Sequence, residues 1–470
     1  MSEKGIALYL AVLLFCIGMA ACGPTPMPMF PADTPRPVLS ERLIGRIDSS
    51  WIQESFRVSP DSQRVAYAAR VGDKRFVVVG GKEERQYDGI AAPIFSSDSQ
   101  RVAYAARLGD KWFVVVDGKE GKPYDGILEG TLIFSLDSQR VAYGTGAGDK
   151  RFVVVDGKEG KPYDGIGDLT FSPDSQRVAY GARLGDKWCA VVDGNEEKSY
   201  DGIGAGTPIF SPDSQRVAYA AQVGDKWFVV VDGKEKSYDG IMAGSLIFSP
   251  DSQRVAYAAR VGGKWCVAVD GKEGKPYDGI MTGSPIFSPD SQRVAYGTGV
   301  GDKRFVVVDG KEEKPYDGIM EGTPIFSPDS QRVAYAAGVG DKMLAVVDGK
   351  EEKQYDAIGA GSLVFSPDSQ QVAYEARAGD RTFVVVDGKE EKQYDGIAVG
   401  TLIFSPDSQR VAYGAQVGNK QLVVVDGKGG QPYDGIVTTG GGRIIFDSAE
   451  SLHYLVQKGD DIYLVEERIQ

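Results

Sequence analysis

The sequence is built on one repeated segment of ten residues, FSPDSQRVAY. It stands unchanged at 171–180, 210–219, 248–257, 287–296, 326–335 and 404–413, and variants begin at Val58, Phe95, Phe134, Phe365 and Phe446. Successive copies start 37 to 42 residues apart. A period of about 40 residues with strand-like content is typical of propellers, in which a unit buries its apolar faces only against its neighbours.

A single unit, residues 207–244, predicts four short antiparallel strands. Turn residues follow the first strand, because Pro fixes φ and the Asp and Ser side chains bond to nearby backbone. Gly-Asp and Asp-Gly pairs then mark two tight hairpins. The apolar run in the third strand indicates that both of its faces are covered. Such a unit is a propeller blade, with strands predicted at 208–211, 216–222, 227–231 and 236–238.

Eleven starts predict an all-β protein, a β-propeller of about ten to eleven four-stranded blades. We expect one large ring, and two rings are the alternative. The last unit has only three strands, at 444–447, 452–457 and 462–465. We expect residues 43–47 to supply its fourth strand, which would remove the open sheet edges of the ring.

The N-terminal segment has the features of an export signal. Residues 6–21 are apolar and uncharged, and sixteen residues are short for a membrane span. The segment Met19-Ala20-Ala21-Cys22 resembles a bacterial lipobox. This resemblance implies cleavage before Cys22 and attachment of a diacylglyceryl group to its sulfur. The alternative is an ordinary signal peptide or a signal anchor, which would make the protein secreted or signal-anchored.

The domains predicted from these features are a signal peptide at 1–21, a Pro-rich tether at 22–40 and the propeller array at 41–470. Within the array, FSPDSQRVAY followed by an apolar strand and a DG hairpin resembles the TolB-type, WD-repeat-like propeller family. Family repeats commonly read SPDG, and here Ser replaces the Gly. The resemblance implies the fold strongly and the function weakly.

Composition argues against several function classes. The net charge is −13, and the unit 95–133 holds six acids and five bases, so a nucleic-acid partner is not expected. The one histidine, His453, is expected to have a packing or surface role, and Cys189 and Cys266 are expected to be buried small hydrophobes. The repeated carboxylates have turn-forming roles, and the sequence contains no phosphate-binding loop or zinc spacing. We therefore expect no enzyme, no cofactor and no metal.

The near-identity of the blades favours repeated contacts with a partner. Our leading hypothesis is a non-enzymatic binding or scaffolding propeller, lipid-anchored in the cell envelope, that engages another envelope protein or a polymer. The alternatives are a carboxylate-using hydrolase or carbohydrate-active propeller and a structural spacer. Variation is concentrated in the segment that follows YDGI, and we expect this variable segment on one rim with the GDK hairpins. The predicted partner-binding residues are Arg70, Arg107, Arg183, Arg260, Arg377, Glu129, Met242, Met281 and Glu321.

Overall fold

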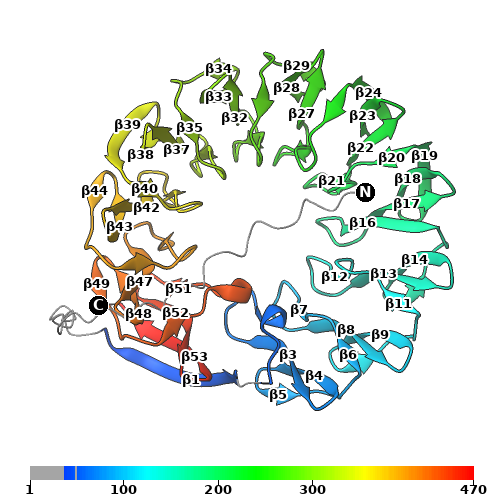
Figure 1. Cartoon of the computed structure of the whole chain (residues 1–470), viewed down its shortest axis with the longest axis horizontal. Coiled ribbons are helices and arrows are strands. Elements are labelled where there is room, and N and C mark those ends of the chain that lie inside the picture. Colours follow the sequence, from blue (N-terminus) through cyan, green and yellow to red (C-terminus); the bar gives the residue numbers. More distant parts are fainter. Residues whose placement is uncertain (1–35, 48–49, 470) are drawn as a thin grey trace, which may run out of the picture. The chain divides into compact units, whose positions relative to one another are not determined.

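The computed structural model describes residues 36–47 and 50–469, which form eleven β-sheets arranged around a single ring (Figure 1). Helical structure in these residues is limited to two 3-10 turns, Gln53–Ser55 and Thr439–Gly441. The prediction of an all-β propeller in one large ring is confirmed, and the two-ring alternative is excluded.

We number the blades from 1 to 11 along the chain, so that β2–β5 form blade 1 and β50–β53 belong to blade 11. In blade 5 the chain runs outward from the axis through antiparallel strands that follow the predicted order. These are β20 (Gly202–Ile203), β21 (Ile209–Phe210), β22 (Val217–Val223), β23 (Lys226–Val231) and β24 (Lys234–Tyr238).

The innermost strand differs from the prediction, because it is made in two pieces. β20 pairs with the hairpin end of β22, and β21 pairs with its beginning. Residues 204–208 lie between them and form a bulge, in which Gly206 has a φ of 77°. The Gly-Ile of YDGI therefore belongs to the innermost strand, whereas its Tyr ends the outermost strand of the preceding blade. Glycine permits this backbone conformation. Each piece of the strand is only two residues long, so it shows too little alternation of polar and apolar residues for the sequence to predict it.

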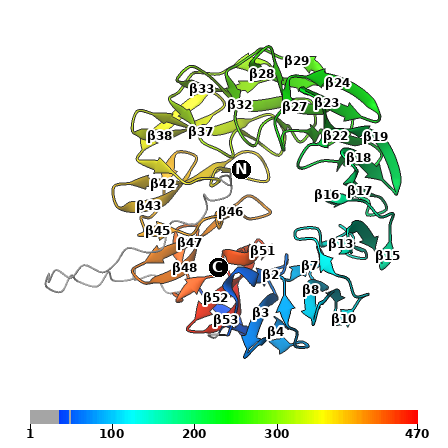
Figure 2. The ribbon, with the colours of Figure 1, turned by 45° about the vertical axis from the view of Figure 1, so that its right-hand side comes forward.

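An N-terminal strand completes the last blade, as predicted. β1 (Val38–Arg46) begins before residue 41 and pairs antiparallel with β53 (Asp461–Arg468). Blade 11 also contains β50 (Gly435–Ile436), β51 (Ile445–Ser448) and β52 (Ser451–Lys458). Figures 1 and 2 show β53 beside the first blade, and Leu464 packs in one apolar cluster with Val65 and Phe76. The first and last thirds of the chain thus meet in a closed ring.

The core lies in the seams between neighbouring blades. In the seam between blades 3 and 4, Tyr163 and Tyr180 meet edge to face with ring centroids 6.2 Å apart. The same tyrosine pair recurs along the array, as in Tyr316 with Tyr335, so the predicted role of the repeated tyrosines in packing is confirmed. Cys189 belongs to the same apolar cluster as Tyr163 and has a free, buried thiol, and burial raises its pKa.

Candidate functional site

The rim that carries the SPDSQR turns is a chain of locks between blades. In the seam between blades 8 and 9, the backbone N–H of Asp329 donates to Ser369 Oγ at 2.9 Å. The Asp329 carboxylate itself accepts hydrogen bonds from the Ser327 hydroxyl and the Gln331 backbone. The same inter-blade contact occurs in nine seams. The repeated aspartate is therefore a structural group of the turn.

An arginine makes the second lock. Arg332 of blade 8 is bound by Asp348 at 2.9 Å and donates to the carbonyl oxygens of Ser369 and Gln370 in blade 9. Its guanidinium carbon lies 5.2 Å from the ring centre of Phe365. Arginines make the carbonyl and ring contacts in eight seams, at Arg64, Arg101, Arg140, Arg177, Arg216, Arg254, Arg293 and Arg332.

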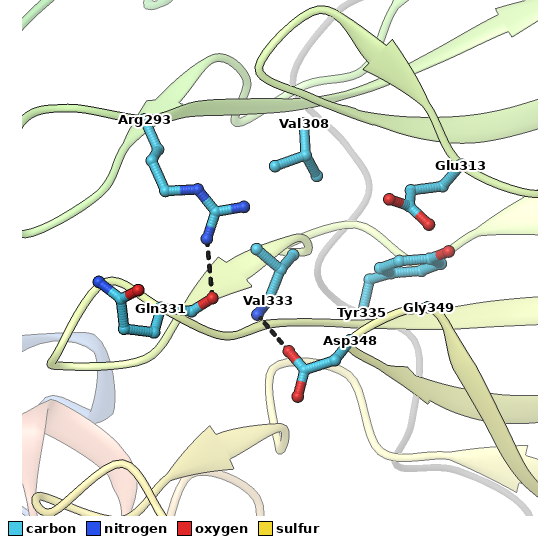
Figure 3. Close-up of a pocket in the computed structure, with 8 residues that line it drawn as sticks. All are labelled: Arg293, Val308, Glu313, Gln331, Val333, Tyr335, Asp348 and Gly349. Carbon is cyan, nitrogen blue, oxygen red and sulfur yellow. Dashed lines mark hydrogen bonds between the residues drawn. The ribbon is translucent and has the colours of Figure 1, made fainter.

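Figure 3 shows this lock between blades 7 and 8, where Arg293 reaches the backbone oxygen of Gln331. A cavity of about 220 Å³ adjoins it, lined also by Glu313 and Tyr335. The Tyr335 hydroxyl is buried and finds no hydrogen-bond partner among the described residues, whereas the equivalent Tyr374 donates to Glu352. Because the cavity is small and lies within the seam beside the arginine lock, we assign it to the packing of the blades.

A third lock joins the outer strands. Lys353 of blade 8 pairs with Glu390 of blade 9 at 2.5 Å. Eight seams carry such a pair, with Arg85 in place of Lys in the first. The partners are largely exposed, so each pair contributes little stability by itself.

The opposite rim carries the GDK hairpins and the YDG aspartates. Asp88 accepts hydrogen bonds from Lys74 of blade 1 and from the backbone of Gly109 in blade 2. The hydrogen bond from Lys74 is the largest cause that holds the pKa of Asp88 below its ordinary value, and the Gly109 bond adds to it. The YDG aspartates thus share a rim with the GDK hairpins. The YDG carboxylate is a further structural group.

The variable residues lie on the bulges of the innermost strands, which face the centre of the ring (Figure 1). We call these segments the axial bulges; in blade 3 the bulge is 128–132 and in blade 10 it is 398–402. Glu129 and Glu321 are exposed on them, and Val399 is 75% exposed. The expected rim position of these residues is therefore wrong, because their segment belongs to the innermost strand.

The two predicted methionines are packing residues. Met242 and Met281 are half-buried and lie against the apolar clusters of the seams that follow their blades. In blade 7 the Met281 side chain covers Gly297, which leaves no room for a Cβ atom there. Their burial makes them poor candidates for direct contact with a partner.

The five predicted arginines lie at the hairpin end of each second strand. Arg107 stacks on Trp112 and Arg260 on Trp265, each at 6.0 Å, and Arg183 donates to the backbone of Asp164 at 3.3 Å. Arg70 and Arg377 are exposed. Within the described part of the chain, none of the five arginines forms an ion pair with a carboxylate, Glu129 and Glu321 included.

Glu375 is a candidate residue that sequence reasoning missed. It lies in β42 (Val372–Ala378) at a position that holds small residues such as Ala336 and Gly414 in neighbouring blades. Its carboxylate covers Gly359 on the axial bulge of blade 9. Burial raises its pKa, and no hydrogen bond to this carboxylate is present among residues 36–47 and 50–469. The sequence signal was its charge, which is the only one at this position in the VAYxA segments.

The other reactive side chains have structural positions. His453 is buried between blades 11 and 1, with Nδ1 at 2.8 Å from Asp447 and Nε2 at 2.8 Å from the carbonyl oxygen of Asp61. No group of His, Cys, Asp and Glu residues suited to a metal ion occurs in the described segments. The same segments contain no helix long and apolar enough to cross a membrane. Cys22 lies outside the described residues.

Comparisons with known proteins assign this chain neither a family nor a function. No protein-family model matches the sequence, and no curated protein is similar to it. Among 412 solved chains with a related structure is a eukaryotic initiation factor, at 14% identity and a TM-score of 0.40, with 71% of this chain and 97% of that chain covered. The propeller domain of the Trilobed protease from Pyrococcus furiosus has 14% identity and a TM-score of 0.28, with 56% and 94% covered. KlHsv2 with loop 6CD replaced by a Gly-Ser linker has 11% identity and a TM-score of 0.30, with 57% and 98% covered. At these scores no argument about activity or partners follows.

Proposed function

We propose that the protein is a non-enzymatic binding or scaffolding ring whose partner contacts the axial bulges. One observation supports this most directly. The SPDSQR arginines and aspartates, the YDG aspartates and the outer basic–glutamate pairs are engaged within or between blades, whereas the exposed residues of the bulges differ from blade to blade. Exposed segments on a rigid scaffold are where proteins place binding residues. The partner is proposed to be another protein or a polymer of the cell envelope.

Site-specific crosslinking tests this proposal. A photoreactive amino acid replaces Glu129, Thr282 or Val399 on three axial bulges, and Lys119 or Lys158 on the outer strands as a matched exposed control. We expect adducts of one reproducible mass from the three axial positions and none from the outer ones. Equal labelling from both sets, or none from either, contradicts the proposal.

We further propose that the ring is tethered to a membrane through a lipid on Cys22. The support is the sequence Met19-Ala20-Ala21-Cys22 after an apolar segment. Two or three acyl chains anchor a protein stably, whereas one holds only marginally. Labelling with a radioactive fatty acid is expected for the natural sequence and not for Cys22→Ala. Equal labelling of both proteins, or none, would be inconsistent with the anchor.

A hydrolase is the second candidate, and Glu375 is the observation that favours it. A general acid needs a carboxyl group whose pKa is raised, and burial raises that of Glu375. The experiment is a screen with glycoside and ester substrates, followed by Glu375→Gln. Turnover that is lost in this variant, and kept in Glu321→Gln on another axial bulge, would favour the enzyme over the binding ring.

A further inference from the structure

Within the described residues, the seam between blades 9 and 10 lacks the arginine lock that the eight seams before it carry. Gln371 stands where Arg332 stands one blade earlier, and Gly429 stands where Glu390 stands one blade earlier. The eight seams from blades 1/2 to blades 8/9 carry both an arginine lock and a pair between a basic residue and a glutamate. This seam therefore differs from the eight seams that precede it.

The frame that surrounds the arginine is nevertheless kept. The backbone N–H of Asp368 donates to Ser408 Oγ at 2.9 Å, the same distance as from Asp329 to Ser369 one seam earlier. Val372 N–H donates to Asp387 Oδ1 at 2.9 Å, and its counterpart in blade 8 does so to Asp348 at 3.0 Å. The Asp387 carboxylate of blade 9 and the turn of blade 10 thus make the same backbone contacts as their counterparts in the arginine-locked seams.

Among residues 36–47 and 50–469, no guanidinium bonds to the groups of this seam that correspond to those holding one elsewhere. These groups are the Asp387 carboxylate, the carbonyl oxygens of Ser408 and Gln409, and the ring of Phe404. The side-chain amide of Gln371 donates no hydrogen bond to them within the described residues. Asp387 and Gln409 are exposed, so that a group from solvent can reach them.

We propose that this seam, defined by Asp387, Ser408, Gln409 and Phe404, is a binding site for a guanidinium group supplied from outside the blades. A guanidinium is planar, offers donors to a carboxylate and to carbonyl oxygens at once, and stacks on an aromatic ring. A primary ammonium is a compact point charge and cannot make these contacts together. The source is the arginine side chain of a partner protein or a small guanidinium compound. The site is separate from the axial bulges, so its failure would leave the proposed function standing.

Counting the sites for methylguanidinium by titration calorimetry tests the proposal, with circular dichroism as the check on folding. We expect one site in the natural protein. Gln371→Arg fills it with the arginine of the neighbouring seams and should leave none. Arg332→Gln copies the arrangement into the seam between blades 8 and 9 and should give two. Both substitutions use residues that the array already carries at this position, so neither should prevent folding.

Two further sets of measurements test which chemical group the site binds and where that group comes from. Methylammonium is the matched control ligand and should bind the natural protein at least about tenfold more weakly than methylguanidinium. Methylguanidinium should bind the Asp387→Ala variant at least about tenfold more weakly than the natural protein, because a charge-assisted contact is lost. The peptide Gly-Arg-Gly binding more tightly than methylguanidinium indicates a protein source, and equal affinity indicates a small compound. An unchanged site in Gln371→Arg, no site in the natural protein, or equal binding of the two cations would overturn the proposal.

Discussion

In the seam between blades 8 and 9 the polar locks lie at the surface, whereas in the seam between blades 10 and 11 they are buried. The Arg332–Asp348 pair is 26% and 41% exposed in its two side chains. The pair of Arg36 with Glu467 is 7% and 0% exposed. Arg36 also donates to the carbonyl oxygens of Val423 and Lys428 in blade 10, and Tyr454 donates to Glu467. Along the array, stability is shared among many weak polar contacts between blades. The closure of the ring at blade 11 depends instead on a few buried contacts.

This difference follows from how often each contact occurs. A lock repeated in eight seams can be weak in each, because the loss of one leaves the others in place. The closure occurs once and must hold β1 against β53 to protect two sheet edges. A buried ion pair with all of its hydrogen bonds made fixes such a single arrangement, although it costs desolvation.

The largest expected effect comes from Arg36→Ala. It leaves the Glu467 carboxylate buried without its cation, and we expect a loss of about 3–5 kcal/mol in the free energy of unfolding. Thermal unfolding and hydrogen exchange of β53 measure it. Arg46→Ala is the control, because Arg46 pairs with Asp461 at the exposed end of the same strand pair and should change little. Equal effects of the two substitutions would show that closure does not depend on the buried pair.

The next effect is expected for His453→Leu at the other closing seam. The substitution removes the bonds of the ring to Asp447 and to the Asp61 carbonyl oxygen. We expect a loss of about 1–3 kcal/mol, since a buried acceptor loses its partner. Faster hydrogen exchange should be confined to β52 and the first turn of blade 1. His453→Gln, which keeps a donor, should lose less, and an equal loss would contradict the hydrogen-bonding role.

Exchanging the residues at the arginine position of two neighbouring seams should change the free energy of unfolding by a smaller amount, in opposite directions in the two seams. Arg332→Gln should cost about 1 kcal/mol, and Gln371→Arg should gain about as much, because the guanidinium is part-exposed and makes several bonds. Hydrogen exchange at Ser369 and Ser408 measures each seam separately. Lys119→Gln, an exposed change on an outer strand, is the control. Effects of the same sign would refute the equivalence of the two seams.

The smallest effect is the pH dependence of Glu375. Burial raises its pKa in the folded protein above the ordinary value of 4.5, so the folded state binds the proton more tightly. The carboxylate therefore costs no stability below the ordinary pKa and costs progressively more as the pH rises through the folded pKa. Glu375→Gln should be more stable than the natural protein at neutral pH and equal to it at low pH. Glu321→Gln should show no such trend, and a gain for Glu375→Gln that grows on acidification would contradict the assignment.

Much of the fold could be predicted from the sequence, because each repeat contains the same signals for strands and turns. The Gly and Asp residues of the hairpins, the apolar third strand and the paired tyrosines each have one local meaning, and eleven copies remove the ambiguity of any one. The missing strand of the last unit predicted the closure by β1. The candidate site was less predictable. Glu129 and Glu321 were identified as exposed and variable, but their segment was placed on the wrong part of the blade.

The sequence by itself determined the kind of unit, the number of units to within one, and the strand that closes them. These depend on local turn chemistry and on the alternation of apolar residues. Only the tertiary structure decided which residues face one another across a seam. The partners of Arg332 lie 37 and 38 residues away, those of Arg36 lie more than 385 residues away, and Glu375 packs against Gly359 of its axial bulge, which lies 16 positions earlier in the chain. Such contacts are set by the curvature of the whole ring, which no single repeat contains.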